Sequence, residues 1–167
     1  MAAEQPPASF PLHTDLSWLE RPPRFGFLQA LDIPPCGGDT IWVSLQAAFE
    51  ALSPPFRSFL AQLDGRHTID ATLRRTVEAN HGPATAASFE AGHTPVDHPL
   101  VRAHPDTGQP LLYVCPMYLD RLLGLTSDES DLVLGHLNRI VNDPNIAVRW
   151  RWSTGDVAIW DESATVH

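Results

Sequence analysis

Residues 147–161 read Ala-Val-Arg-Trp-Arg-Trp-Ser-Thr-Gly-Asp-Val-Ala-Ile-Trp-Asp, and this stretch decides the fold class. Apolar and polar residues alternate over 147–152, and a Thr154-Gly155-Asp156 turn leads into a second apolar run. A period of two on either side of a glycine turn is typical of adjacent β-strands. The end of the chain is therefore predicted to be β structure.

A second β cluster is predicted near the start of the chain. The apolar run 25–33 is bounded by proline pairs at 22–23 and 34–35, which indicates a buried strand. Gly37-Gly38 then predicts a turn, and residues 39–43 predict another strand.

Helices are predicted between the two β clusters. Ser44 and Ser53-Pro54 are typical helix starts, and Thr126 with Glu129 forms a capping box for a helix that ends near Val141. Strands are predicted at 98–104 and 111–114, around an Asp106-Thr107-Gly108 turn. The expected apolar side of the last helix consists of Leu132, Val133, Leu137 and Ile140.

The chain is predicted to form one domain over residues 1–167. Residues 1–11 are rich in proline and alanine and suggest a flexible leader. Residues 66–97 show little periodicity, which indicates an insert that is part lid and part loop.

Composition limits the class of protein. Of the 167 residues, 43% are apolar and 19% charged, which suits a folded domain. A net charge of −9 gives no basic face, so nucleic acid and anionic membranes are not expected partners. No run is apolar and long enough to span a bilayer, and the start of the chain does not look like a signal peptide. The isolated Cys36 and Cys115 are typical of reduced thiols, so a cytoplasmic location is expected.

The most informative chemical pattern is His13-Thr14-Asp15 together with His167 at the other end of the sequence. In an extended strand, residues i and i+2 share a face, so His13 and Asp15 can offer ligands to one metal ion. His167 can supply a third ligand, which gives the two-histidine, one-carboxylate arrangement of non-haem Fe(II) oxygenases. The tripeptide alone also fits a surface turn. A jelly roll is the economical fold that brings such distant ends together, with β structure dominant and helical insertions between.

Several longer strings occur in order along the chain. They are His13-Thr14-Asp15, the proline pair 22–23, GGDTIW at 37–42, Phe56-Arg57, HPLVR at 98–102, VRWRW at 148–152, and GDVAIWD at 155–161 followed by His167. Together they resemble the Fe(II)/2-oxoglutarate dioxygenases of the taurine dioxygenase family. The resemblance implies a double-stranded β-helix, which is a cupin-like jelly roll.

The resemblance also implies roles for individual residues. His13, Asp15 and His167 correspond to the iron ligands, and Thr40 to a hydroxyl that hydrogen-bonds a carboxylate of 2-oxoglutarate. On the substrate side of the metal, the corresponding residues are Leu16, Tyr118 and Trp160. Without the resemblance, Thr40 would pass for an ordinary β-branched strand residue.

The implied activity uses Fe(II), 2-oxoglutarate and O2, and releases succinate and CO2 as it hydroxylates a small organic anion. A sulfonate such as taurine or an alkyl sulfate is the expected substrate, and Gly124-Leu125-Thr126 looks slightly more like the alkyl sulfate branch. A phenoxyalkanoate or another carboxylic acid remains an alternative. Because family members commonly self-associate, a homo-oligomer is also expected.

The sequence departs from the family pattern in three places. The family carries two arginines beyond the distal histidine, additional chain before the His-x-Asp motif, and Asn-Arg where this chain has Glu162-Ser163. These departures predict a chain shortened at both ends, with lower stability and activity than its relatives. The alternative is a non-catalytic remnant that binds metal but not 2-oxoglutarate. The complete triad and Thr40 favour the enzyme.

Overall fold

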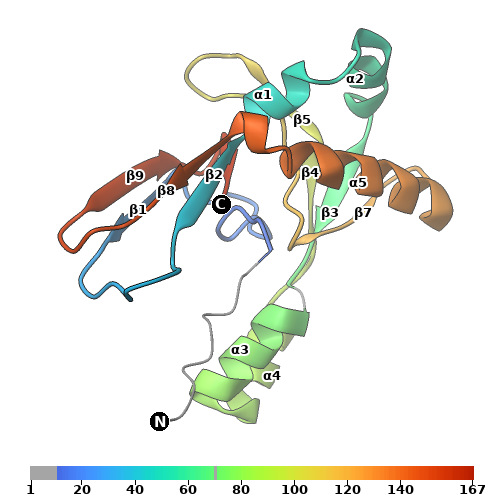
Figure 1. Ribbon diagram of the computed structural model, residues 1–167. Coiled ribbons are helices and arrows are strands. Elements are labelled where there is room, and N and C mark those ends of the chain that lie inside the picture. Colours follow the sequence, from blue (N-terminus) through green and yellow to red (C-terminus); the bar gives the residue numbers. More distant parts are fainter. Residues whose placement is uncertain (1–10, 70) are drawn as a thin grey trace.

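The computed structural model describes residues 11–69 and 71–167, and Figure 1 shows its ribbon. Nearly all of the predicted leader, residues 1–10, lies outside the described residues. In chain order the elements are β1 (Phe25–Gln29), β2 (Thr40–Ser44), α1 (Leu45–Glu50), α2 (Pro54–Leu60), β3 (Asp64–His67), α3 (Ala71–His81), α4 (Pro83–Ala91), β4 (Val96–Pro99), β5 (Val101–Ala103), β6 (Pro110–Leu112), β7 (Leu119–Leu122), α5 (Ser127–Val141), η1 (Pro144–Ile146), β8 (Ala147–Trp150), β9 (Val157–Asp161) and β10 (Thr165–Val166).

Strands from the two ends of the chain pair with each other, as the sequence predicts. β1 pairs with β9, and β2 lies between β8 and β10, with every pairing antiparallel. Two further sheets, β4-β3-β7 and β5-β6, form the middle of the molecule.

The described strands do not form the closed jelly roll that we expected. They make four sheets of two or three strands each, and strands such as β1, β8 and β10 have one described neighbour. A barrel closes only when every strand has partners on both edges. The antiparallel strands and the helical insertions are confirmed, but β structure does not dominate, because the described helices contain more residues than the described strands. Closure of the sheets is not seen within residues 11–69 and 71–167.

The core lies between the sheets and the helices α1 and α5. Helix α1 packs on β6 and α5 packs on β7. Ser44 caps α1 as predicted, because its hydroxyl accepts a hydrogen bond from the Ala47 N–H at 3.1 Å. The fully buried apolar side chains include Leu45, Leu60, Leu100, Leu112, Val114, Leu137 and Val166.

Helix α5 begins with the predicted capping box. The Thr126 hydroxyl accepts from the Glu129 N–H, and the Glu129 carboxylate accepts from the Thr126 N–H at 2.9 Å. Leu137 is buried, but Leu132, which we expected on the same face, is 76% exposed. The two residues are five positions apart, so they point about 140° away from each other around a helix of 3.6 residues per turn.

Residues 66–97 are more regular than the loop that their sequence suggested. They contain a helical hairpin, α3 and α4, that extends away from the body below β3 and β4 (Figure 1). Gly82 turns the chain with a φ of 85°, and Pro83 begins α4. Leu73 in α3 and Phe89 in α4 pack against a buried cluster that contains Trp18 and Tyr118. A lid role for this segment stays a prediction.

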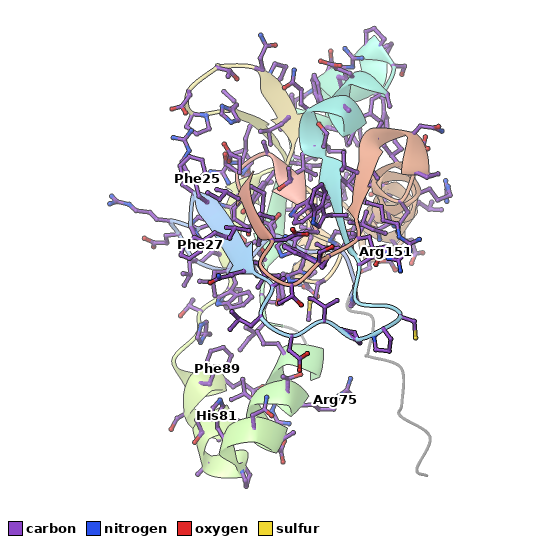
Figure 2. All side chains as sticks on the ribbon, turned by 60° about the vertical axis from the view of Figure 1, so that its left-hand side comes forward. Phe25, Phe27, Arg75, His81, Phe89 and Arg151 are labelled. Carbon is purple, nitrogen blue, oxygen red and sulfur yellow. The ribbon has the colours of Figure 1, made fainter. Side chains whose placement is uncertain are left out.

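The strand β1 was predicted to be buried, and this was wrong. Phe27 is 77% exposed, and Ile159, its partner in β9, is 73% exposed. Figure 2 shows Phe25 and Phe27 on the open side of this two-stranded ribbon. The opposite side carries Gly26 and Trp160, which face the site described below. Of the described helices, none has the combination of length and apolar character needed to cross a membrane.

Candidate metal centre

Backbone pairing joins the two ends of the described chain. The His13 N–H donates to the His167 carbonyl, and the His167 N–H donates to the His13 carbonyl, both at 2.8 Å. This reciprocal pair is the hydrogen-bonded unit of an antiparallel ladder. Nearby, the Thr14 hydroxyl donates to the Thr165 carbonyl at 2.9 Å, and the Thr14 N–H donates to the buried Cys115 thiol at 3.3 Å.

His13, Asp15 and His167 converge on one point. Each offers one ligand atom, and these atoms lie within 4.8 Å of one another. His13 Nε2 is 3.4 Å from Asp15 Oδ1, and the two imidazole centroids are 4.6 Å apart. Both histidines are largely buried, whereas half of the Asp15 side chain is exposed. The sequence analysis placed His13 and Asp15 in an extended strand, but the chain turns immediately after Asp15, and Leu16 has a φ of 55°.

In the metal-free chain, the pKa shifts of Asp15 and His167 favour the protonation states that metal ligation requires, whereas the shift of His13 favours its proton, which an ion would have to displace. Burial works to lower the pKa of His13, but hydrogen bonds with Asp15 and Pro11 outweigh it and raise that pKa. The contact with His13 lowers the pKa of Asp15. Burial and the neighbouring His13 lower the pKa of His167 to about 4, so this imidazole is neutral at pH 7. A carboxylate and a neutral imidazole are the protonation states that metal ligation requires.

Glu162 lies directly behind the three converging side chains. It is fully buried, and its Oε2 accepts a hydrogen bond from the Asp15 N–H at 3.0 Å. Its Oε1 accepts from the Trp160 indole N–H and lies 3.9 Å from His167 Nδ1. Burial raises the pKa of Glu162, and these donated hydrogen bonds act against that rise. In the sequence, Glu162 is marked only by its departure from the family pattern.

Thr40 lies at the start of β2, in the sheet that also contains β10 and leads to His167. Its hydroxyl oxygen accepts a hydrogen bond from the Trp152 indole N–H at 2.9 Å. A hydroxyl has one proton to donate, so this contact leaves the Thr40 proton available for an anionic acceptor. Trp152 is buried and lies beyond the end of β8, so no strand pattern in the sequence indicates its contact with Thr40.

Tyr118 and Trp160 lie beside the histidines. The Tyr118 ring meets that of His13 edge-on at 6.0 Å, and Trp18 packs against Tyr118 at 4.4 Å. The Trp160 ring lies 4.9 Å from that of His167. Leu16 follows Asp15 directly and is 41% exposed. The structure thus places Tyr118 and Trp160 beside the candidate ligands, whereas Leu16 adjoins Asp15 in sequence. Two imidazoles with one carboxylate are the donor set of non-haem Fe(II) oxygenases.

Comparison with known proteins identifies the family. Residues 2–167 match the family described as "Taurine catabolism dioxygenase TauD, TfdA family", and the chain belongs to that family.

Two curated relatives and one solved structure illustrate the similarity. The alpha-ketoglutarate-dependent dioxygenase oryG of Aspergillus oryzae is 35% identical over 161 residues, which cover 93% of this chain and 47% of the relative. An alpha-ketoglutarate-dependent sulfate ester dioxygenase of Pseudomonas putida is 32% identical over 162 residues, which cover 93% of this chain and 52% of that relative. The crystal structure of a taurine dioxygenase from Burkholderia xenovorans shares 36% identity at a TM-score of 0.78, over 93% of this chain and 49% of that one. The chain therefore shares the family's fold and spans about half the length of the curated relatives it matches.

Proposed function

We propose that this chain carries the metal centre of an Fe(II)- and 2-oxoglutarate-dependent dioxygenase that hydroxylates a small organic anion. The observation that carries the proposal is the convergence of His13, Asp15 and His167 within 4.8 Å, from opposite ends of the sequence. Family membership supports it, because the matching relatives include several alpha-ketoglutarate-dependent dioxygenases.

The donor set fits Fe(II). His13 Nδ1 lies 3.1 Å from the Pro11 carbonyl, to which it can donate its N–H, so Nε2, which faces Asp15, is the atom that would bind the ion. A neutral His167 and an ionised Asp15 complete two nitrogens and one oxygen, which suit this ion. When bound, Fe(II) with 2-oxoglutarate and O2 supplies oxidative decarboxylation of the co-substrate to succinate and CO2, coupled to hydroxylation of a substrate C–H bond.

Thr40 is proposed to bind 2-oxoglutarate. The Trp152 indole occupies one lone pair of the hydroxyl and so orients its proton toward an acceptor. A co-substrate carboxylate is an acceptor of the required charge, and a charge-assisted hydrogen bond to it would be stronger than a neutral one.

The substrate is proposed to bind on the side of Tyr118, Trp160 and Leu16. Aromatic and apolar walls orient the substrate and exclude water from the reacting carbon. The relatives include a sulfate ester dioxygenase and a taurine dioxygenase, which supports a sulfonate or an alkyl sulfate as the substrate class.

Anaerobic titration tests the proposal. Fe(II) and 2-oxoglutarate are added to the chain, and the weak visible charge-transfer band of the iron–2-oxoglutarate chelate is recorded. We expect the band with the natural chain and none with Asp15→Ala, while Asp131→Ala, which removes an exposed carboxylate on α5, leaves it unchanged. Stoichiometric iron binding by Asp15→Ala would contradict the ligand role of Asp15. Iron binding by the natural chain without the band would support the alternative, a non-catalytic remnant that binds metal but not 2-oxoglutarate. Succinate formation over a panel of sulfonates and alkyl sulfates then identifies the substrate.

A further inference from the structure

The buried carboxylate of Glu162 makes an unusual set of contacts. Its side chain has no exposed surface, and both oxygens face N–H donors. The backbone N–H of Asp15 donates to Oε2 at 3.0 Å, and the indole N–H of Trp160 donates to Oε1 at 2.5 Å. Burying a carboxylate is costly unless hydrogen bonds compensate, so a residue placed here for packing alone would be apolar.

A third donor lies beside the same carboxylate. Nδ1 of His167 is buried and has no hydrogen-bond partner among the described residues, and Glu162 Oε1 lies 3.9 Å away. His13, the other histidine, has its Nδ1 3.1 Å from the Pro11 carbonyl. Histidines that bind metals through one ring nitrogen usually donate the other N–H to a carbonyl or a carboxylate. Pro11 fits that role for His13, and Glu162 is the matching group for His167.

The neighbouring strand leaves room for this carboxylate. Gly26 in β1 lies opposite Trp160, and a Cβ at position 26 would fall 2.4 Å from Trp160 Cε2 and 2.6 Å from Glu162 Oε1. Any larger residue would displace the indole and the carboxylate together, so Gly26 allows the backbone to approach both groups.

We propose that Glu162 is a positioning residue of the metal centre, which accepts the Nδ1–H of His167 and holds Asp15 through its backbone N–H. This inference rests on the proposed metal site. One carboxylate would thereby orient two of the three ligands, His167 by its ring and Asp15 by its main chain. The Nδ1–H tautomer of His167 leaves Nε2 as the metal-binding atom.

Glu162→Gln is the informative variant. In the natural chain both carboxylate oxygens of Glu162 accept hydrogen bonds. Glutamine has the same size but replaces one of these oxygens with an NH2 group, which would face an N–H donor. Glu20→Gln is a matched control, because Glu20 is exposed and lies in the segment just after the His-x-Asp motif. Binding of Co(II), a spectroscopic substitute for Fe(II), is measured by titration without 2-oxoglutarate, and melting in EDTA checks that each variant folds.

We expect Glu162→Gln to bind Co(II) about 10- to 100-fold more weakly and to shift the ligand-field bands at saturation. Glu20→Gln should match the natural chain in both. Natural affinity and natural bands in Glu162→Gln would overturn the inference while leaving the metal centre intact. A natural chain that binds no Co(II) would overturn the metal centre and this inference with it.

A measurement on the natural chain covers the case in which Glu162→Gln does not fold. Two-dimensional NMR of chain labelled with ¹⁵N-histidine, loaded with diamagnetic Zn(II), distinguishes the two ring tautomers. The His167 signals are assigned by their loss in His167→Ala. The inference requires the Nδ1–H tautomer at His167, and the Nε2–H tautomer would overturn it.

Discussion

Acid is expected to destabilise the folded chain through His67. This side chain is fully buried, stacks on Tyr113 with ring centroids 5.2 Å apart, and has its Nδ1 3.0 Å from the Ser17 hydroxyl. Burial, reinforced by nearby His98 and Arg102, lowers the pKa of His67 from 6.5 to about 3. In the unfolded chain the same imidazole titrates near its ordinary value.

The sign and size of the effect follow from linkage between protonation and folding. Between the two pKa values the unfolded state binds a proton that the folded state does not, so stability falls as the pH falls. The free energy of unfolding then changes by at most about 1.4 kcal/mol per pH unit. Between pH 7 and pH 5, the titration of His67 alone lowers the free energy of unfolding by about 2 kcal/mol. Above pH 7 the group contributes almost no pH dependence.

Urea unfolding in EDTA at pH 7 and pH 5 isolates this contribution. His67→Asn keeps a polar atom near the position of Nδ1 and removes the titration. His81→Asn, at the exposed end of α3 and labelled in Figure 2, is the matched control. From pH 7 to pH 5, the free energy of unfolding of His67→Asn should fall by about 2 kcal/mol less than that of the natural chain. The free energy of unfolding of the control should fall by as much as that of the natural chain. An equal loss in the natural chain and in His67→Asn would refute the reasoning.

Two further changes test the helix cap and the proposed co-substrate site. Thr126→Ala removes one half of the α5 capping box and should lower the free energy of unfolding by about 1 kcal/mol in urea titrations; an unchanged midpoint would show that the cap is dispensable. Trp152→Phe removes the hydrogen bond that orients the Thr40 hydroxyl, so 2-oxoglutarate should bind roughly 5- to 10-fold more weakly to the metal-loaded chain, at a cost of about 1 kcal/mol. Co(II) affinity should not change in Trp152→Phe, and a parallel loss of both affinities would argue against a specific role for Thr40.

Local signals explain what the sequence predicted well. The caps at Ser44 and Thr126 involve residues three positions apart, so each helix start can be recognised without knowledge of the rest of the fold. The meeting of His13 with His167 is a long-range feature, and it was predicted because the donor types themselves suggested a shared ion.

Burial was harder to predict, because it depends on what packs against an element from elsewhere in the chain. Phe27 lies in an apolar run but forms the open side of a two-stranded ribbon. Helix α4 consists mostly of small residues, so no stripe of large apolar side chains marks it as a helix. Closure of the sheets was also predicted, but within the described residues β1, β8 and β10 each pair along one edge.

The site's supporting contacts were missed for a related reason. Glu162 and Trp152 act on Asp15 and Thr40 across more than a hundred residues of sequence, and no local pattern marks such pairs. A glutamate two residues after Trp160 was visible in the sequence, but its complete burial was not.

Anomalous diffraction at the iron edge, from crystals of the chain grown anaerobically with Fe(II), tests the central claim most directly. The account predicts one peak per chain, within bonding distance of His13, Asp15 and His167. A peak elsewhere, or none beside these three residues at full iron loading, would contradict it.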